Sequence, residues 1–165
     1  MWVRAQAGPL GRGQQDSRNV DFSKVLNQSK AGKEAQDYLK AKFESESKKF
    51  SQEEKKLRKE EADIISKKKL ITNEEYQKKV EVLRKKVSQL QKNKQNSLKK
   101  IAKLRNQART ELLKNLNPLM REYMEKNKIR IVLDKKSILL GDIKLDITDE
   151  IIKLLDKKLK SIKLN

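Results

Sequence analysis

The chain has 165 residues, of which 39% are charged, 35% are hydrophobic and only 4% are aromatic, proportions that suit long solvated helices better than a thick globular core. Its 42 Lys and Arg residues outnumber 23 Asp and Glu residues, and the resulting net charge of +19 favours acidic partners: nucleic acid, anionic headgroups or acidic polypeptides. Because the chain has no His and no Cys, nearly every nucleophilic triad, zinc site and imidazole acid–base scheme is excluded, and we expect no enzyme activity, catalytic residue, metal site or cofactor.

The N-terminal segment carries little information about the fold. Residues 1–17 lack the apolar centre of a secretory signal, and we interpret them as a disordered or non-native tail. No apolar run in the chain approaches the roughly 20 residues of a membrane span. Residues 18–28 predict a short extended segment that leads into a helical turn, with Val20 and Phe22 among its apolar side chains.

Two long helices are predicted over residues 30–69 and 73–126. In the second, apolar residues recur at alternating steps of four and three, the a/d seam of a coiled coil: Tyr76, Val80, Leu83, Val87 and Leu90, then Ile101, Leu104, Ala108 and Leu112. In the first, one apolar residue recurs in every heptad: Phe43, Phe50, Leu57, Ile64 and Ile71. Each helix has a narrow stripe to bury, so each is expected to pack on the other.

The segment between the helices has the features of a tight turn. Thr72 and Glu75 have the spacing of a capping box, in which the hydroxyl and the carboxylate each accept a backbone N–H. Lys67, Lys68 and Lys69 lie where a helix C-terminus favours cations. The sequence therefore predicts an antiparallel helical hairpin.

About halfway along this hairpin the apolar seam is interrupted in both helices. Residues 92–97 and 45–49 are polar, and they face each other if the turn is centred near Ile71. We predict a soft point there, because few buried contacts would resist local opening. The alternative is an ordinary hydrated stretch of a rigid hairpin.

The end of the second helix and the residues after it change in pattern. Pro118 lacks an N–H and clashes with the preceding turn, so it predicts a kink or the start of a new segment. Residues 129–134 and 138–140 predict two strands, each followed by a turn. Thr148 is the expected N-cap of a final amphipathic helix.

The predicted fold class is mainly α with a small β head. A long antiparallel hairpin over residues 30–126 is attached to a small β-sheet domain formed by residues 18–29 and 127–165. A sheet this small is only marginally stable alone, so we expect the chain to self-associate. For Ile129, Ile131 and Leu133 we favour a place in the interface between chains over one in the core of a single chain.

Three segments at the two ends of the hairpin are distinctive: residues 25–29 (VLNQS) with 32–35 (GKEA), residues 129–134 (IRIVLD) and residues 146–151 (DITDEI). In this order they resemble the Skp/OmpH family of periplasmic chaperones. The resemblance spans roughly residues 19–160. The chain departs from the family's pattern in its short first strand, which retains only Val20 and Phe22, and in the signal peptide, which is not visible.

The resemblance implies an ATP-independent holdase that keeps unfolded outer-membrane β-barrel proteins soluble in the periplasm. It implies a homotrimer with a shared β-barrel head and three hairpins around a cavity. The candidate trimer-interface residues are Val20, Phe22, Ile129, Ile131, Leu133 and Leu139. The candidate client contacts are Phe43, Phe50, Lys67, Lys68 and Lys69. For the two Phe residues we favour an ordinary role in the coiled-coil seam. For the three Lys residues we favour the role of solvated charges that compensate the helix dipole.

A basic coiled-coil nucleic-acid-binding or structural protein is the alternative function. The charge favours nucleic acid, but the sequence lacks a recognition motif, aromatic stacking positions in its basic stretches and a continuous basic segment, so we do not expect it. There is no Gly-rich phosphate loop, so ATP-driven cycling is not expected either. An anionic membrane surface or lipopolysaccharide is a further candidate partner at the three Lys residues.

Overall fold

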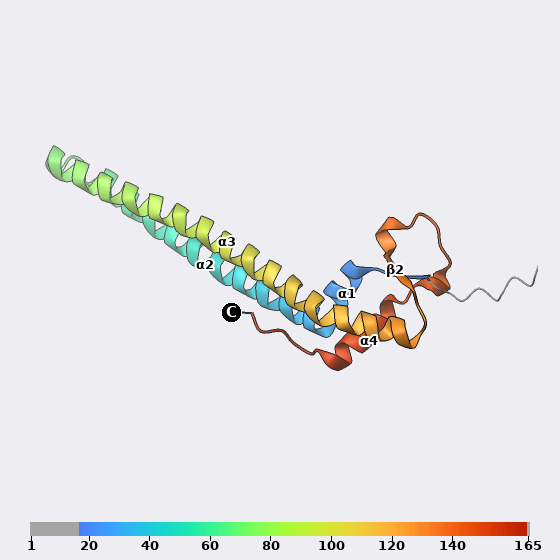
Figure 1. The fold of residues 1–165 in the computed structure, drawn as a ribbon. Coiled ribbons are helices and arrows are strands. Elements are labelled where there is room, and N and C mark those ends of the chain that lie inside the picture. Colours follow the sequence, from blue (N-terminus) through green and yellow to red (C-terminus); the bar gives the residue numbers. More distant parts are fainter. Residues whose placement is uncertain (1–16, 165) are drawn as a thin grey trace, which may run out of the picture. The chain divides into compact units, whose positions relative to one another are not determined.

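The computed structural model describes residues 17–164 (Figure 1). The chain forms two compact units, and the described part of the first comprises residues 17–35 and 108–163, here called the strand–helix unit. Residues 36–107, together with Leu164, form the second, here called the hairpin unit. Residues 1–16 of the predicted N-terminal tail lie outside the described residues, whereas Ser17 already begins a strand.

Two long helices, α2 (Lys30–Ser66) and α3 (Asn73–Lys126), run side by side in opposite directions through the hairpin unit (Figure 1). The predicted capping box is confirmed: Glu75 N donates to Thr72 Oγ1 at 3.2 Å, and Thr72 N donates to Glu75 Oε2 at 3.3 Å. These two bonds satisfy backbone donors that the first turn of α3 would otherwise leave unpaired.

The predicted seam is confirmed by burial within the hairpin unit. Ile64 of α2 and Leu83, Leu90 and Leu104 of α3 are all buried. Val87, although it occupies a seam position, stays exposed. The seam therefore holds the two helices together but is not closed along its whole length.

The strand–helix unit has an apolar core to which three of its helices contribute. Strand β1 (Ser17–Val20) pairs in parallel with β2 (Ile131–Asp134), with Ser17 opposite Ile131. Helices α1 (Phe22–Gln28) and α4 (Thr148–Lys158) pack beside them with the end of α3. The fully or nearly fully buried residues are Val20, Val25, Leu116, Leu119, Met120, Ile129, Ile147, Ile151 and Leu155.

Pro118 does not end α3, so the prediction of a new segment there is wrong. The helix continues to Lys126 with Pro118 on its exposed face. Its neighbours Leu116, Leu119 and Met120 are buried in the core. Their burial holds the helix in place and outweighs the local cost of the missing N–H.

The second predicted strand, at residues 138–140, is also absent from the described structure. This segment is a loop between two short 3₁₀ turns, η1 (Lys135–Ser137) and η2 (Ile143–Leu145). The apolar run predicted a strand, but a strand also requires a hydrogen-bonding neighbour, and no strand of the described residues pairs with this segment.

Thr148 is the first residue of α4 and not its N-cap, which corrects another prediction. Ile147 is the residue at the N-cap position, and its apolar side chain forms no capping hydrogen bond. The Thr148 hydroxyl instead accepts a hydrogen bond from Asp21 N at 3.0 Å and donates one to Asp146 Oδ1. It thereby links α4 to the residue that caps α1, because Asp21 Oδ1 accepts from Lys24 N.

Candidate functional site

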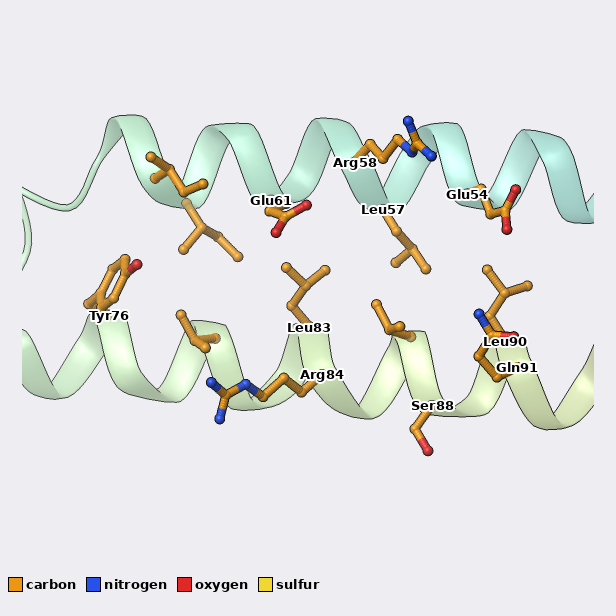
Figure 2. Close-up of a pocket in the computed structure, with 14 residues that line it drawn as sticks. Glu54, Leu57, Arg58, Glu61, Tyr76, Leu83, Arg84, Ser88, Leu90 and Gln91 are labelled. Atoms are coloured by element: carbon orange, nitrogen blue, oxygen red, sulfur yellow. The ribbon is translucent and has the colours of Figure 1, made fainter.

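An apolar groove lies along the seam of the hairpin unit, between the part of α2 before the turn and the part of α3 after it. Its volume is about 570 Å³. In Figure 2, Leu57 of α2 and Leu83 and Leu90 of α3 point into the space between the two helices. Tyr76 lies at the end nearest the turn (Figure 2). Val87, a seam residue of α3, stays exposed in the lining of the groove, because α2 has only one apolar seam side chain per heptad and leaves Val87 uncovered.

Charged side chains line the sides of this groove. Arg58 extends from α2 and Arg84 from α3, outside the row of leucines (Figure 2). Glu54 also lines it, but its carboxylate is paired with Lys94 of the opposite helix. The hydrogen bond from Lys94 and its charge hold the pKa of Glu54 below its ordinary value. Glu61 is a further acidic side chain in the lining.

A second, smaller hollow of about 310 Å³ lies near the middle of the hairpin. Phe43 and Phe50, two of the predicted client contacts, both line it, together with Leu98 and Ile101. Phe43 is exposed and Phe50 is half-buried. The structure therefore brings these two residues together at one hollow with an accessible apolar surface.

Polar contacts between the helices occur at this same level. Lys94 pairs with Glu54, and Ser97 Oγ donates to Glu46 Oε2 at 3.2 Å. Lys94 and Ser97 continue the steps of four and three from Leu90 to Ile101, so they occupy seam positions. The gap in the seam is thus a polar layer in an unbroken heptad pattern.

The three lysines of the turn do not line either hollow. Lys67 pairs with Asp63 at 2.8 Å, and Lys68 lies 5.3 Å from the centre of the Tyr76 ring. Leu70, beside them, has 81% of its surface exposed. Sequence reasoning missed Leu70, although a leucine that directly follows three lysines at a turn is a signal of an exposed apolar side chain.

The six candidate interface residues divide into two groups in the strand–helix unit. Val20 and Ile129 lie in the core of the chain, and Phe22 packs against it. Ile131 and Leu133 of β2 are 49% and 42% exposed, and Leu139 is 99% exposed. Leu140 and Ile143, which sequence reasoning missed, are 95% and 90% exposed. Most of the accessible apolar surface of this unit is therefore on β2 and the loop after it.

Asp146 lies at the centre of a polar cluster in the strand–helix unit. Lys135 Nζ donates to its Oδ2 at 2.5 Å, and both the backbone N and the hydroxyl of Thr148 donate to its Oδ1. Although partial burial opposes ionisation, these hydrogen bonds and the charge of Lys135 lower the pKa of Asp146 to about 2. The cluster joins η1, α4 and the start of α1 through ionised and hydrogen-bonded groups.

Neither metal-binding nor membrane-spanning features were found in the described part of the chain. No group of His, Cys, Asp and Glu side chains among residues 17–164 is arranged to hold a metal ion. None of the helices described there has the length and hydrophobicity needed to cross a bilayer.

Comparison with known proteins gives a family and a fold. Residues 19–155 match the family described as outer membrane protein (OmpH-like). A solved structure of a candidate outer membrane chaperone (OmpH-like) from Caulobacter crescentus CB15 superposes with a TM-score of 0.87 and 19% sequence identity. The alignment covers 100% of this chain and 96% of the other, and at this identity it shows a shared fold. No curated protein sequence matches the chain significantly.

Proposed function

Because the chain belongs to the OmpH-like outer membrane protein family, we propose that it is a holding chaperone for unfolded outer-membrane β-barrel proteins. It would bind these clients in the periplasm, without ATP, and prevent their aggregation. The fold shared with the candidate outer membrane chaperone from Caulobacter crescentus supports this proposal. The lack of His and Cys, which excludes most enzyme classes, is consistent with this proposal.

The observation that carries the proposal is the open apolar groove of about 570 Å³ on the hairpin. A holding chaperone needs weak and adaptable contacts, and an open groove provides them where a closed pocket would select one ligand. The surrounding lysines add to this, because their methylenes lie on apolar surface while their ammonium groups stay hydrated. A net charge of +19 would also speed the encounter with acidic clients, increasingly so at low salt.

We further propose that three chains assemble through the strand–helix unit. Ile131, Leu133 and Leu139 offer the accessible apolar surface, and Val20, Phe22 and Ile129 would support it from within the chain. In such a trimer the three hairpins would surround a cavity, with Phe43 and Phe50 as client contacts. Lys67, Lys68 and Lys69 would then be available to clients, to an anionic membrane or to lipopolysaccharide.

Dilution of a urea-denatured outer-membrane barrel into the full chain, without nucleotide, tests the function. We expect light scattering by the client to be suppressed and a soluble complex to elute in size-exclusion chromatography. A compact basic protein of similar net charge is the control for electrostatic effects alone. A client that precipitates at the same rate with either protein would refute the holding function.

Nucleic-acid binding is the second candidate, because a charge of +19 would attract any polyanion. Titration of duplex DNA at rising salt distinguishes the two functions. We expect binding that disappears near physiological salt, as for contacts to phosphates alone. Tight binding that persists there would favour the nucleic-acid function.

A further inference from the structure

Two arginines, Arg58 and Arg84, lie on the sides of the apolar groove. Arg58 and Arg84 are both exposed, and within residues 17–164 neither forms an ion pair or a hydrogen bond with another side chain. Arg58 interacts electrostatically with Glu54, but the carboxylate of Glu54 is already paired with Lys94. Several other acids of the hairpin are also paired with lysines: Glu60 with Lys86, Asp63 with Lys67 and Glu81 with Lys85.

The groove thus combines an apolar floor with a free cation on each side. A guanidinium group binds a carboxylate through two parallel hydrogen bonds, and it does so even where the site is partly hydrated. Ile65 and Val87 are exposed in the lining of the groove and Leu57 is half-buried, so they provide a floor that an apolar side chain can cover. An extended segment with one apolar residue between two acidic residues has the matching pattern of charge and hydrophobicity.

Resting on the proposed function, we propose that this groove binds segments of unfolded clients in which an apolar side chain is flanked by Asp or Glu. Arg58 and Arg84 are the residues that determine this specificity. Glu61 lines the same groove and repels the acidic flanks, so it limits the affinity and allows release. Substitutions of the arginines and of Glu61 are therefore expected to have opposite effects on the affinity for these segments.

Three unstructured fluorescent peptides test the specificity. They share one apolar centre and carry flanks of Asp, Asn or Lys, and their binding to the full chain is followed by anisotropy. We expect the Asp peptide to bind most tightly and the Lys peptide least. The advantage of the Asp peptide should shrink as salt rises, because the ion pairs are exposed to solvent.

Variants of the groove separate its arginines from the general charge of the hairpin. The double variant R58Q/R84Q is expected to bind the Asp peptide about three- to tenfold more weakly and the Asn peptide within about twofold of wild type. The matched control K59Q/K79Q removes the same charge from exposed positions of the same helices outside the groove, and should change Asp-peptide binding by less than about twofold. E61Q should bind the Asp peptide more tightly. Gln keeps the helix propensity, and circular dichroism checks the fold.

Each other outcome would overturn the inference. Equal losses of affinity for the Asp peptide in R58Q/R84Q and in K59Q/K79Q would show that the effect comes from overall charge. A change in the mass of R58Q/R84Q in solution would mean that a second copy of the chain covers the groove. Binding of phosphatidylglycerol vesicles that only R58Q/R84Q loses would assign the groove to lipid. A wild-type chain that prevents aggregation while R58Q/R84Q binds every peptide normally would refute the inference and leave the proposed function standing.

Discussion

Gly32 lies near the start of α2, close to the last turn of α1. A Cβ at this position would be 1.9 Å from the backbone oxygen of Leu26 and 2.9 Å from Ser29 Oγ. The nearest contact is to backbone, so the clash could be relieved only if the two helices moved apart. Gly32 N also donates to Ser29 Oγ at 3.2 Å, which closes the corner between the helices.

Gly32→Ala is therefore expected to lower the free energy of unfolding by about 2–3 kcal/mol, through overpacking at a backbone contact. Urea unfolding followed by circular dichroism measures it. Gly141→Ala is the matched control, because a Cβ there meets only Ile138 Cγ2 at 3.5 Å, an ordinary contact. The control should change stability by less than about 1 kcal/mol. Equal effects of the two substitutions would contradict the role given to Gly32.

Asp146 should make the stability of the strand–helix unit depend on pH. Its pKa is about 2 in the folded chain and 3.8 ordinarily, so the ionised form stabilises the fold above about pH 4. This contribution is lost as the pH falls from about 4 to about 2. Because the side chain is only 20% exposed, the shift corresponds to about 2 kcal/mol at neutral pH.

Asp146→Asn should consequently destabilise the chain by about 1–2 kcal/mol at pH 7 and by much less near pH 2. Unfolding by urea at several pH values measures both. Asp149→Asn is the control: Asp149 pairs with Lys24, but its side chain is 70% exposed, so a change below about 1 kcal/mol is expected. An Asp146→Asn effect that does not vary with pH would show that charge is not involved.

At the scale of the elements, the hairpin joins two well-packed stretches of seam through one polar layer. Leu83 and Leu90 are buried on one side of it and Leu104 on the other, whereas Lys94 and Ser97 occupy the seam positions between them. Polar residues at seam positions keep the register of a coiled coil but lower its stability.

We therefore predict faster amide exchange at residues 92–98 than at residues 80–90, measured by hydrogen exchange and mass spectrometry on the native chain. The variant K94L/S97L restores apolar residues to the seam and should slow exchange in this layer by about tenfold or more. K92L/N96L places the same side chains at exposed positions and should leave the exchange rates nearly unchanged. Uniformly slow exchange along α3 in the wild type would rule out a soft point.

The elements that could be predicted from the sequence are those whose partners lie close along the chain or recur with a period. The capping box joins residues three apart, and the seam repeats every heptad, so both were correct. The errors arose where a distant partner decides the structure. Thr148 is not an N-cap because its hydroxyl bonds to Asp21, 127 residues away. The groove was missed for the same reason, since Arg58 and Arg84 come together only when α2 and α3 pair.

At the scale of the whole molecule, the described part of the chain leaves large apolar side chains exposed on β2 and in the loop after it. Strand β2 pairs with β1 on one edge, and in the sheet formed by residues 17–164 it has no neighbour on the other. An open strand edge beside exposed apolar side chains is a site for pairing with another chain. Assembly with another chain would therefore provide the further strand pairing that the sequence predicted within one chain at residues 138–140.

Ile131→Asp and Leu139→Asp are each expected to break up the assembly without unfolding the chain. Both side chains are accessible in the single chain, so the helix content should be unchanged. Burial of a carboxylate in the interface between chains, however, would cost several kcal/mol of association free energy. Light scattering should give three times the chain mass for the wild type and a lower mass for each variant at the same concentration. Leu70→Asp, at the exposed turn of the hairpin, is the control and should keep the wild-type mass. A wild type that remains monomeric at high concentration would refute the trimer. Variants that assemble as well as the wild type would move the interface away from β2.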